Sequence, residues 1–266
     1  MKTSTPAILL AALAASCAHG APNSSKLPEK DTHNDWGYEG PGGPNVWHEL
    51  SHNNKLCAAG KSQSPINVSP GDGVTKPVDG STLRFEPNPY PRGVALKNLG
   101  HSVQISLDGS VFLNKWIYDI KQAHFHTPSE HRLRGEYFPV EVHFVAETAA
   151  GANAVIGFFV ELANGKNRFS DYLTAILKNV GKVPKKGDVT TTEPLNPLAL
   201  QYHVRESKVH QYNGSLTTPP CSENVLFNIV EKPLYIDVEE YQALKSVVKY
   251  NSRFTQNRDG KASELS

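Results

Sequence analysis

Three histidines in two short segments constrain this chain more than any other feature of its sequence. His124 and His126 stand two residues apart, and His143 lies within the alternating segment Glu141 to Val145. Residues two apart on a β-strand point to the same side, so each segment presents its histidines on one face. The residues between the segments include two prolines and a glycine, which allow the chain to turn back. The sequence therefore predicts two strands that bring three imidazoles to one point.

Three imidazole nitrogens are a typical ligand set for a catalytic zinc ion whose fourth position stays open for water. Because no ligand is an anion, the ion would keep its full charge and make hydroxide available near neutral pH. Gln122 and Glu141 each precede a histidine by two residues, on the same strand face. Their oxygens are suited to bind the second ring nitrogen and so fix the tautomer. For any one histidine alone, the alternative is a packed side chain without a metal.

The first residues have the composition of a secretory signal peptide. Lys2 precedes an apolar run from Ala7 to Ala15, and small residues follow. We therefore assign residues 1–20 to a signal peptide and residues 21–266 to one secreted domain, which is extracellular or, in a bacterium, periplasmic. No later apolar run is long enough for a transmembrane helix, and the polar C-terminus does not resemble a lipid-anchor signal, so no membrane anchor is expected.

Cleavage of this peptide would remove Cys17 and leave Cys57 and Cys221. An even number of cysteines in a secreted chain favours a disulfide, and two buried free thiols are the alternative. Three sequons are candidate N-glycosylation sites, although about as many would arise by chance in this composition. They lie at Asn23, Asn67 and Asn213.

The composition indicates one globular domain without a strongly charged partner. The whole chain has 27 basic and 26 acidic residues, and loss of Lys2 balances the two. Neither nucleic acid nor an anionic membrane is therefore expected as a partner. Roughly 245 mature residues without a linker or repeat fit one large domain. Nothing in the sequence indicates an oligomeric state.

Most of the chain is predicted to form short strands. The expected strands are Ser102–Leu107, Trp116–His126, Val140–Ala146, Ala154–Val160 and Asn224–Val230. The fourth is apolar throughout, as expected for a strand covered on both faces. A period of 3.6 residues predicts helices at Ser170–Val180 and Asp237–Val248, the second with Glu240 three residues after its Asp237 cap. We expect a mainly β, mixed α/β domain with peripheral short helices.

Five motifs occur in an order that is specific to one family. They are Gln63-Ser64-Pro65-Ile66-Asn67, Gly100-His101, the run from Gln122 to His131, Glu141-Val142-His143, and the run from Ser215 to Cys221. In this order they resemble the α-class carbonic anhydrases, and the resemblance extends from Trp36 to about Gln256. It implies a large, mostly antiparallel twisted sheet with zinc at the base of a conical cleft. It also implies a lyase that hydrates carbon dioxide reversibly to bicarbonate and a proton, through attack by hydroxide bound to zinc.

The resemblance assigns roles to individual residues. His124, His126 and His143 match the zinc ligands. Thr217 and Glu130 match a pair in which the carboxylate accepts a hydrogen bond from the threonine. Because an ionised carboxylate is only an acceptor, the hydroxyl would then be able only to accept from the zinc ligand, which selects a ligand that bears a proton. A turn hydroxyl and a loop charge are the alternatives for these two residues.

The remaining roles concern the proton and the substrate. His101 matches the family's proton shuttle, which suits a side chain whose pKa lies near neutrality; the alternative is an exposed histidine without a role. The pocket for carbon dioxide is expected to be apolar. The residues that match its lining are Val145, Val155, Leu216, Thr217, Thr218 and Val225. Tyr38 and Gln104, together with Thr218, match the polar side that holds ordered water.

The chain also departs from the best-known animal members of the family. Leu99 precedes the Gly-His step, Gln104 replaces an asparagine, and Thr127 follows the second ligand where tryptophan is frequent. Phe227 and Asn228 replace a tryptophan and an apolar residue. The residues of the ligand run, together with Cys221, resemble those of secreted microbial, fungal and plant members. These departures bear on turnover rate and pocket width and leave the expected reaction unchanged.

Two alternatives to this activity fit parts of the same sequence. A cupin-type metal enzyme would use Glu130 as a ligand, but it needs a second Gly-rich motif that ends in histidine, and the sequence around His143 has no such pattern. A catalytically inactive, carbonic-anhydrase-like binding module would have lost a metal ligand, whereas all three histidines are present.

Overall fold

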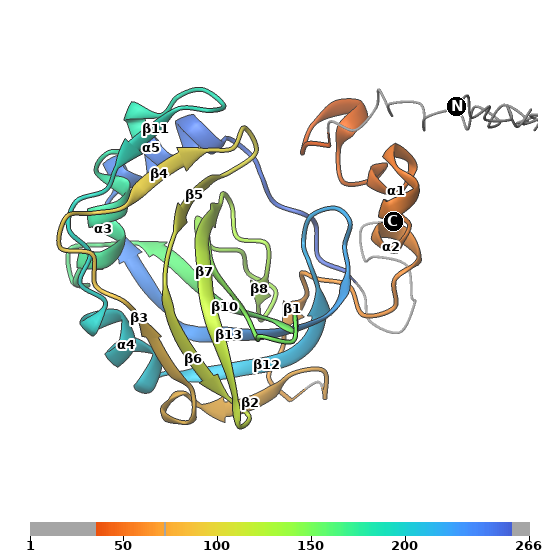
Figure 1. Cartoon of the computed structure of the whole chain (residues 1–266), viewed down its shortest axis with the longest axis horizontal. Coiled ribbons are helices and arrows are strands. Elements are labelled where there is room, and N and C mark those ends of the chain that lie inside the picture. Colours follow the sequence, from red (N-terminus) through yellow and green to blue (C-terminus); the bar gives the residue numbers. More distant parts are fainter. Residues whose placement is uncertain (1–35, 72, 257–266) are drawn as a thin grey trace, which may run out of the picture. The chain divides into compact units, whose positions relative to one another are not determined.

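A mixed sheet of eleven strands forms the centre of the computed structural model, which describes residues 36–71 and 73–256 (Figure 1). The predicted signal peptide, Cys17 and Asn23 lie outside these residues. The main path of the sheet is β11 (Val189–Thr191), β4 (Ala95–Asn98), β5 (Val103–Ser106), β7 (Trp116–His126), β9 (Val140–Glu147), β10 (Asn153–Leu162), β13 (Glu223–Ile236), β12 (Lys208–Ser215) and β2 (Lys76–Asp79). From β7 a branch leads through β6 (Gly109–Leu113) to β3 (Arg84–Pro87).

The strands pair mostly antiparallel, which confirms the predicted sheet. Within the described part of the chain, the one parallel pair of this sheet joins β10 to β13. A second, two-stranded parallel sheet joins β1 (Asn67–Val68) to β8 (Arg132–Leu133). All five predicted strands are present: β7 has the predicted ends, and the ends of the other four differ from the prediction by at most six residues.

Three helices cover one face of the sheet (Figure 1). They are α3 (Asp171–Leu177), α4 (Leu198–Arg205) and α5 (Val238–Val248). The helix predicted at Ser170–Val180 is α3, which ends three residues early and is followed by a short 3-10 turn, Val180–Lys182. The Ser170 hydroxyl accepts from the backbone N–H of Leu173, and Asp237 begins α5 with the predicted capping box. Both starts are thus set by local sequence.

The other face of the sheet carries a smaller apolar cluster. Along β10, Ala154, Ile156 and Phe158 face the helices, whereas Val155 and Phe159 belong to this second cluster. The strand is therefore covered on both sides, as its continuous apolar run predicts. The short helices α1 (Trp47–Leu50) and α2 (Leu56–Ala59) contribute to a third cluster around Trp47. In the described part of the chain, no helix is both long and apolar enough to cross a membrane.

A β-bulge in β7 decides which side chains face away from the helices. The register of β7 against β9 shifts between Ile120 and Gln122. Ile120 packs in the helix-side core, and so do Ala123 and Phe125, so the alternation reverses across the bulge. As a result Gln122 and the even-numbered residues after it, His124 included, lie on the face opposite to the helices.

The last described residues run across the molecule in an extended segment, without regular secondary structure. The backbone N–H of Asn251 donates to Thr127 O, and that of Gln256 donates to Pro65 O. Arg253 is buried in this segment, and its guanidinium donates to the side chain of Gln63 and the carbonyls of Ser64 and Cys57. Burial lowers the pKa of Arg253 to about 10. The segment thereby ties widely separated parts of the chain together.

Candidate metal centre

Two adjacent strands bring the three predicted histidines together. His124 lies directly opposite His143 in the β7–β9 pair, and His126 lies opposite Glu141. The centroids of the three rings are 4.7 to 5.3 Å apart. One ring nitrogen from each histidine lies within 4.8 Å of those of the other two. The geometry expected from period-two alternation on two neighbouring strands is therefore present.

Each imidazole has a second partner that fixes its orientation. Nδ1 of His124 donates to Gln122 Oε1 at 2.8 Å, and Nε2 of His143 donates to Glu141 Oε1 at 2.7 Å, as expected from the sequence. Nδ1 of His126 donates to the backbone carbonyl of Asn251 at 2.8 Å. Since carbonyl and carboxylate oxygens only accept, these bonds place a proton on the bonded nitrogen. Nε2 of His124, Nε2 of His126 and Nδ1 of His143 are left with free lone pairs.

The donor set fits zinc. Three imidazoles supply neutral nitrogen ligands, and each already has the outer partner that metal-binding histidines use. Nε2 of His126 is buried and has no hydrogen-bond partner among residues 36–71 and 73–256. Its lone pair is therefore available to coordinate a cation. Burial, reinforced by the neighbouring imidazoles, holds the pKa of His124 well below its usual value. For His126, too, burial lowers the pKa. Both therefore favour the neutral form that binds a metal.

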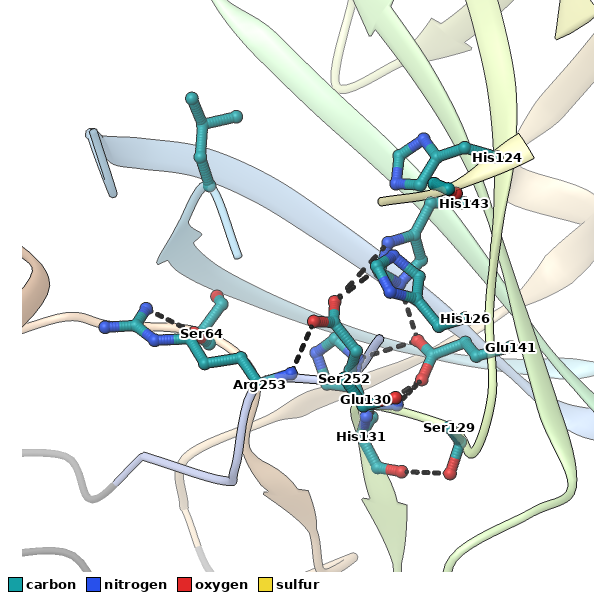
Figure 2. A network of polar contacts seen from close by, with 12 residues as sticks. Ser64, His124, His126, Ser129, Glu130, His131, Glu141, His143, Ser252 and Arg253 are labelled. Atoms are coloured by element: carbon teal, nitrogen blue, oxygen red, sulfur yellow. Dashed lines mark hydrogen bonds and ion pairs between the residues drawn. The ribbon is translucent and has the colours of Figure 1, made fainter. Parts of the chain in front are cut away.

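Glu141 is the anchor of this centre. Its carboxylate is fully buried, and it accepts from His143, from the ring of His131 at 2.7 Å, and from the backbone N–H groups of Glu130 and His131 (Figure 2). Burial alone would raise its pKa, but the two histidines outweigh that effect and hold the pKa of Glu141 well below the usual range. In turn, burial would lower the pKa of His143, and the Glu141 charge raises it instead.

A buried chain of polar groups extends from Glu141 into the protein, and it was not predicted from the sequence. Nε2 of His131 lies 2.6 Å from the hydroxyl of Tyr212, which lies 2.8 Å from Ser64 Oγ. The backbone N–H of Ser215 donates to the same Ser64 oxygen. The motif around His131 was recognised, but its hydrogen-bond partners come from strands far away in the sequence. His131 therefore positions Glu141, and through it a ligand.

Glu130 lies beside His126 and His143, and Figure 2 marks the contacts of one carboxylate oxygen with their rings. Its Oε1 accepts from the backbone N–H of Arg253 at 3.0 Å. Its Oε2 lies 3.4 Å from His126 Nε2 and 3.9 Å from His143 Nδ1. Among the residues that the structure describes, this second oxygen accepts no hydrogen bond, so the bond expected from the buried Thr217 is absent here.

Four of the six expected substrate residues share one apolar region. Val145, Val155, Leu216 and Val225 all belong to the second hydrophobic cluster, on the sheet face that carries the histidines. Thr218 is half-buried, and its carbonyl accepts from the N–H of Cys221. The sequence placed these side chains by family resemblance, and the fold brings them to the same side of the sheet as His143.

The polar residues assigned to the site lie toward its other side. Gln104 of β5 is directly opposite His124 in the sheet. Tyr38 packs edge-on against Trp36 and Trp47, and burial, followed by the charge of Glu130, raises its pKa well above the usual value. His101 lies against Trp36, with ring centroids 4.3 Å apart, and burial lowers its pKa.

The predicted disulfide is confirmed: Cys57 and Cys221 are bonded. Gln63 donates to the carbonyl of Cys221, so the bridge is fixed to the segment that precedes β1. The two sequons in the described residues differ in environment. Asn213 is exposed on β12, whereas the amide of Asn67 accepts from Gly135 and donates to Ser69.

Comparison with known proteins gives a consistent result. Residues 42–259 match the family "Eukaryotic-type carbonic anhydrase". The chain is 32% identical to a carbonic anhydrase of Neisseria gonorrhoeae over 245 residues, which are 91% of this chain and 86% of that protein. It is 30% identical to alpha carbonic anhydrase 4 of Arabidopsis thaliana, over 83% of this chain and 80% of the relative. The solved structure of a fungal alpha carbonic anhydrase from Aspergillus oryzae is 40% identical and superposes with a TM-score of 0.80, covering 86% of this chain and 95% of that one.

Proposed function

This chain belongs to the α-class carbonic anhydrase family, and on that premise we propose that it hydrates carbon dioxide reversibly with a zinc ion held by His124, His126 and His143. Membership of this family excludes the cupin alternative. The observation that carries the zinc proposal is the convergence of three ring nitrogens whose opposite nitrogens are already hydrogen-bonded.

The metal and the ligands have separable tasks. A zinc ion in such a site lowers the pKa of a coordinated water to about 7, a value already established for carbonic anhydrases as a class. The task of the chain is to present three neutral nitrogens at fixed orientations. Gln122, Asn251 and Glu141 do this by accepting a hydrogen bond from the one ring N–H of each neutral histidine.

We assign the orientation of the nucleophile to Thr217 and Glu130. The buried Oε2 of Glu130 accepts no hydrogen bond from the residues that the structure describes. A hydroxyl is a suitable donor for it. When the hydroxyl of Thr217 donates to it, the threonine oxygen can only accept from a group at the reaction centre. The lone pair of that group is then free to face carbon dioxide.

Substrate and product are handled by the two sides of the site. Carbon dioxide offers little to hydrogen-bond, so the apolar side chains of Val145, Val155, Leu216 and Val225 suit it. Thr218, Tyr38 and Gln104 provide the polar side. The proton released in each turnover passes to His101, whose half-buried imidazole lines a surface cavity.

We further propose that the enzyme acts outside the cell, or in the periplasm of a bacterium, after removal of residues 1–20. The disulfide between Cys57 and Cys221 supports an oxidising compartment. Of the two sequons that the structure describes, the exposed Asn213 is better placed to carry a glycan.

Metal analysis combined with stopped-flow hydration of carbon dioxide tests the main proposal. We expect one zinc ion per chain, loss of hydration after chelation, and recovery when zinc is added back. A purified chain that holds no zinc, or that holds zinc without hydrating carbon dioxide, would instead be the inactive binding module.

A further inference from the structure

A loop between the helix side and the sheet edge carries a lysine to the neighbourhood of His101. Residues 183–188 lead into β11, which pairs with β4 at the edge of the sheet. Lys186 of this loop and His101 line the same surface cavity of about 380 Å³. The role of His101 as proton carrier rests on the proposed function, whereas the influence of Lys186 on its imidazole rests on this local geometry.

Asn98 fixes this loop to the turn that contains His101. Its buried side chain donates to Val183 O at 2.8 Å and accepts from the N–H of Gly100 at 2.7 Å. Its backbone N–H donates to Asp188 O, and its carbonyl accepts from Gly187. Three of these hydrogen bonds hold the loop against residues 98–101, and the fourth, from Gly100, fixes the turn itself.

Gly100 leaves room for the stem of Lys186. The residue has a φ of +93°, and a Cβ added to it would lie 2.8 Å from Cδ and 3.0 Å from Cγ of Lys186. The aliphatic stem thus lies directly on the glycine, one residue before His101. The stem therefore lies against the turn that carries His101, and the two residues line one cavity.

We propose that Lys186 is a positioning residue for proton transfer: its charge, held across Gly100 by the bonds of Asn98, weakens the hold of His101 on a proton. A weaker hold favours release of the proton to solvent or buffer. The direction agrees with the lowered pKa of His101, for which burial is the largest cause and Lys186 the next, ahead of His126.

Other groups around His101 act alongside Lys186. Glu39, Lys249 and Tyr250 line the same cavity, Tyr38 adjoins it, and the ring of Trp36 covers the imidazole. The negative charge of Glu39 favours the protonated imidazole of His101, whereas the positive charges of the lysines disfavour it. The exposed position of Lys186 makes its effect sensitive to salt.

The test is a pH titration of the histidine NMR signals of the zinc-loaded enzyme, with the His101 signal assigned from its loss in His101→Gln. We expect the His101 midpoint to rise in Lys186→Met, which keeps the stem, and to rise further in Lys186→Glu. It should stay unchanged in Lys186→Arg and in Lys185→Met, a neighbouring exposed lysine that does not line the cavity. The shift should shrink in high salt. A midpoint that is the same in Lys186→Glu and wild type would overturn the inference.

Activity separates this inference from the proposed function. In weak buffer, the acid limb of kcat against pH should move with the NMR midpoint. If His101→Ala leaves kcat unchanged, His101 is not the proton carrier, and the NMR shift still decides the effect of Lys186. If His101→Ala lowers kcat but Lys186→Glu does not move the NMR midpoint, His101 is still the proton carrier, and the inference about Lys186 is wrong.

Discussion

Glu141 and His143 stand two residues apart on β9, and a 2.7 Å hydrogen bond joins Oε1 of the first to Nε2 of the second. His143 therefore offers Nδ1 to a metal, whereas His124 and His126, bonded through Nδ1, offer Nε2. A strand brings alternate side chains to one face, so a contact between residues two apart selects the nitrogen, while Glu130 and His131 of the loop after β7 hold the Glu141 carboxylate in place.

Replacing His143 with alanine should abolish zinc retention and most of the hydration activity. Two imidazoles remain, which are too few for the three-nitrogen site that zinc enzymes of this kind use. Metal analysis after gel filtration and a stopped-flow assay measure both effects. Normal zinc content together with normal hydration in His143→Ala would show that the ligand assignment is wrong.

Glu141→Ala should weaken zinc binding or activity by roughly 10- to 100-fold, a smaller effect than loss of a ligand. It should also destabilise the fold, because the N–H groups of Glu130 and His131 lose their buried acceptor. Each unsatisfied group costs about 1–3 kcal/mol. Zinc competition with a chelator and urea unfolding measure the two effects. As a matched control, Gln122→Ala removes the partner of the more exposed His124 and should cost less stability.

Removal of the disulfide should lower thermal stability. The bridge spans 164 residues, for which the chain-entropy model gives about 5 kcal/mol as an upper figure. Cys57→Ser combined with Cys221→Ser should therefore unfold at a lower temperature than the oxidised enzyme, and reductant should lower the wild-type midpoint but not that of the variant. Because the Cys221 N–H bonds to Thr218, hydration activity should fall as well. Equal midpoints for oxidised protein and double variant would contradict this expectation.

His101→Ala should lower kcat in weak buffer while kcat/KM for hydration stays nearly unchanged. The first parameter includes proton export, and the second reports only the steps up to release of bicarbonate. Added imidazole should restore kcat by accepting the proton directly. An equal fall in both parameters, without rescue by imidazole, would assign His101 a structural role.

Glu231 accepts hydrogen bonds from His210 and Arg134, and these contacts should make the stability of the fold depend on pH in the acid range. Burial would raise the pKa of Glu231, but the hydrogen bonds from His210 and Arg134 outweigh it, so its folded pKa lies below the unfolded value of about 4.3. Its contribution is therefore present above that unfolded value and is lost as the pH falls through the folded one.

Glu231→Gln should accordingly destabilise the enzyme at pH 7, by about 1 kcal/mol or less for a partly exposed pair, and have little effect at a pH below both values. Urea unfolding at the two pH values measures this difference. The exposed Glu206→Gln is the control and should be neutral at both. A loss of the same size at both pH values would show that the pKa of Glu231 is not lowered by folding.

The sequence predicted what depends on local periodicity. Alternation placed His124 and His143 on facing strands, and the capping box of Asp237 marked the start of α5. The sequence pattern did not predict the bulge after Ile120, which reverses the alternation within β7. The amphipathic pattern of α4 was also missed, because eight residues after a proline give a weak periodic signal.

Long-range partners were beyond the reach of sequence patterns. Glu141 was predicted to bind His143, two residues away, but the acceptor for His126 is a backbone carbonyl 125 residues further on. Backbone carbonyls carry no residue signature, so no motif marks them. The contact between His131, in the loop before β8, and Tyr212 of β12 likewise joins residues 81 positions apart, and only the fold brings them together.

The extended segment that begins at Asn251 sets an order of events during synthesis. A ribosome delivers His124, His126 and His143 more than a hundred residues before Asn251, whose carbonyl orients His126, and before Arg253, whose N–H holds Glu130. A growing chain that has not reached this segment contains the three histidines but lacks the Asn251 carbonyl that binds Nδ1 of His126. The orientation of His126 and of Glu130 therefore requires a chain that extends at least through Arg253, more than a hundred residues beyond the last of the three histidines.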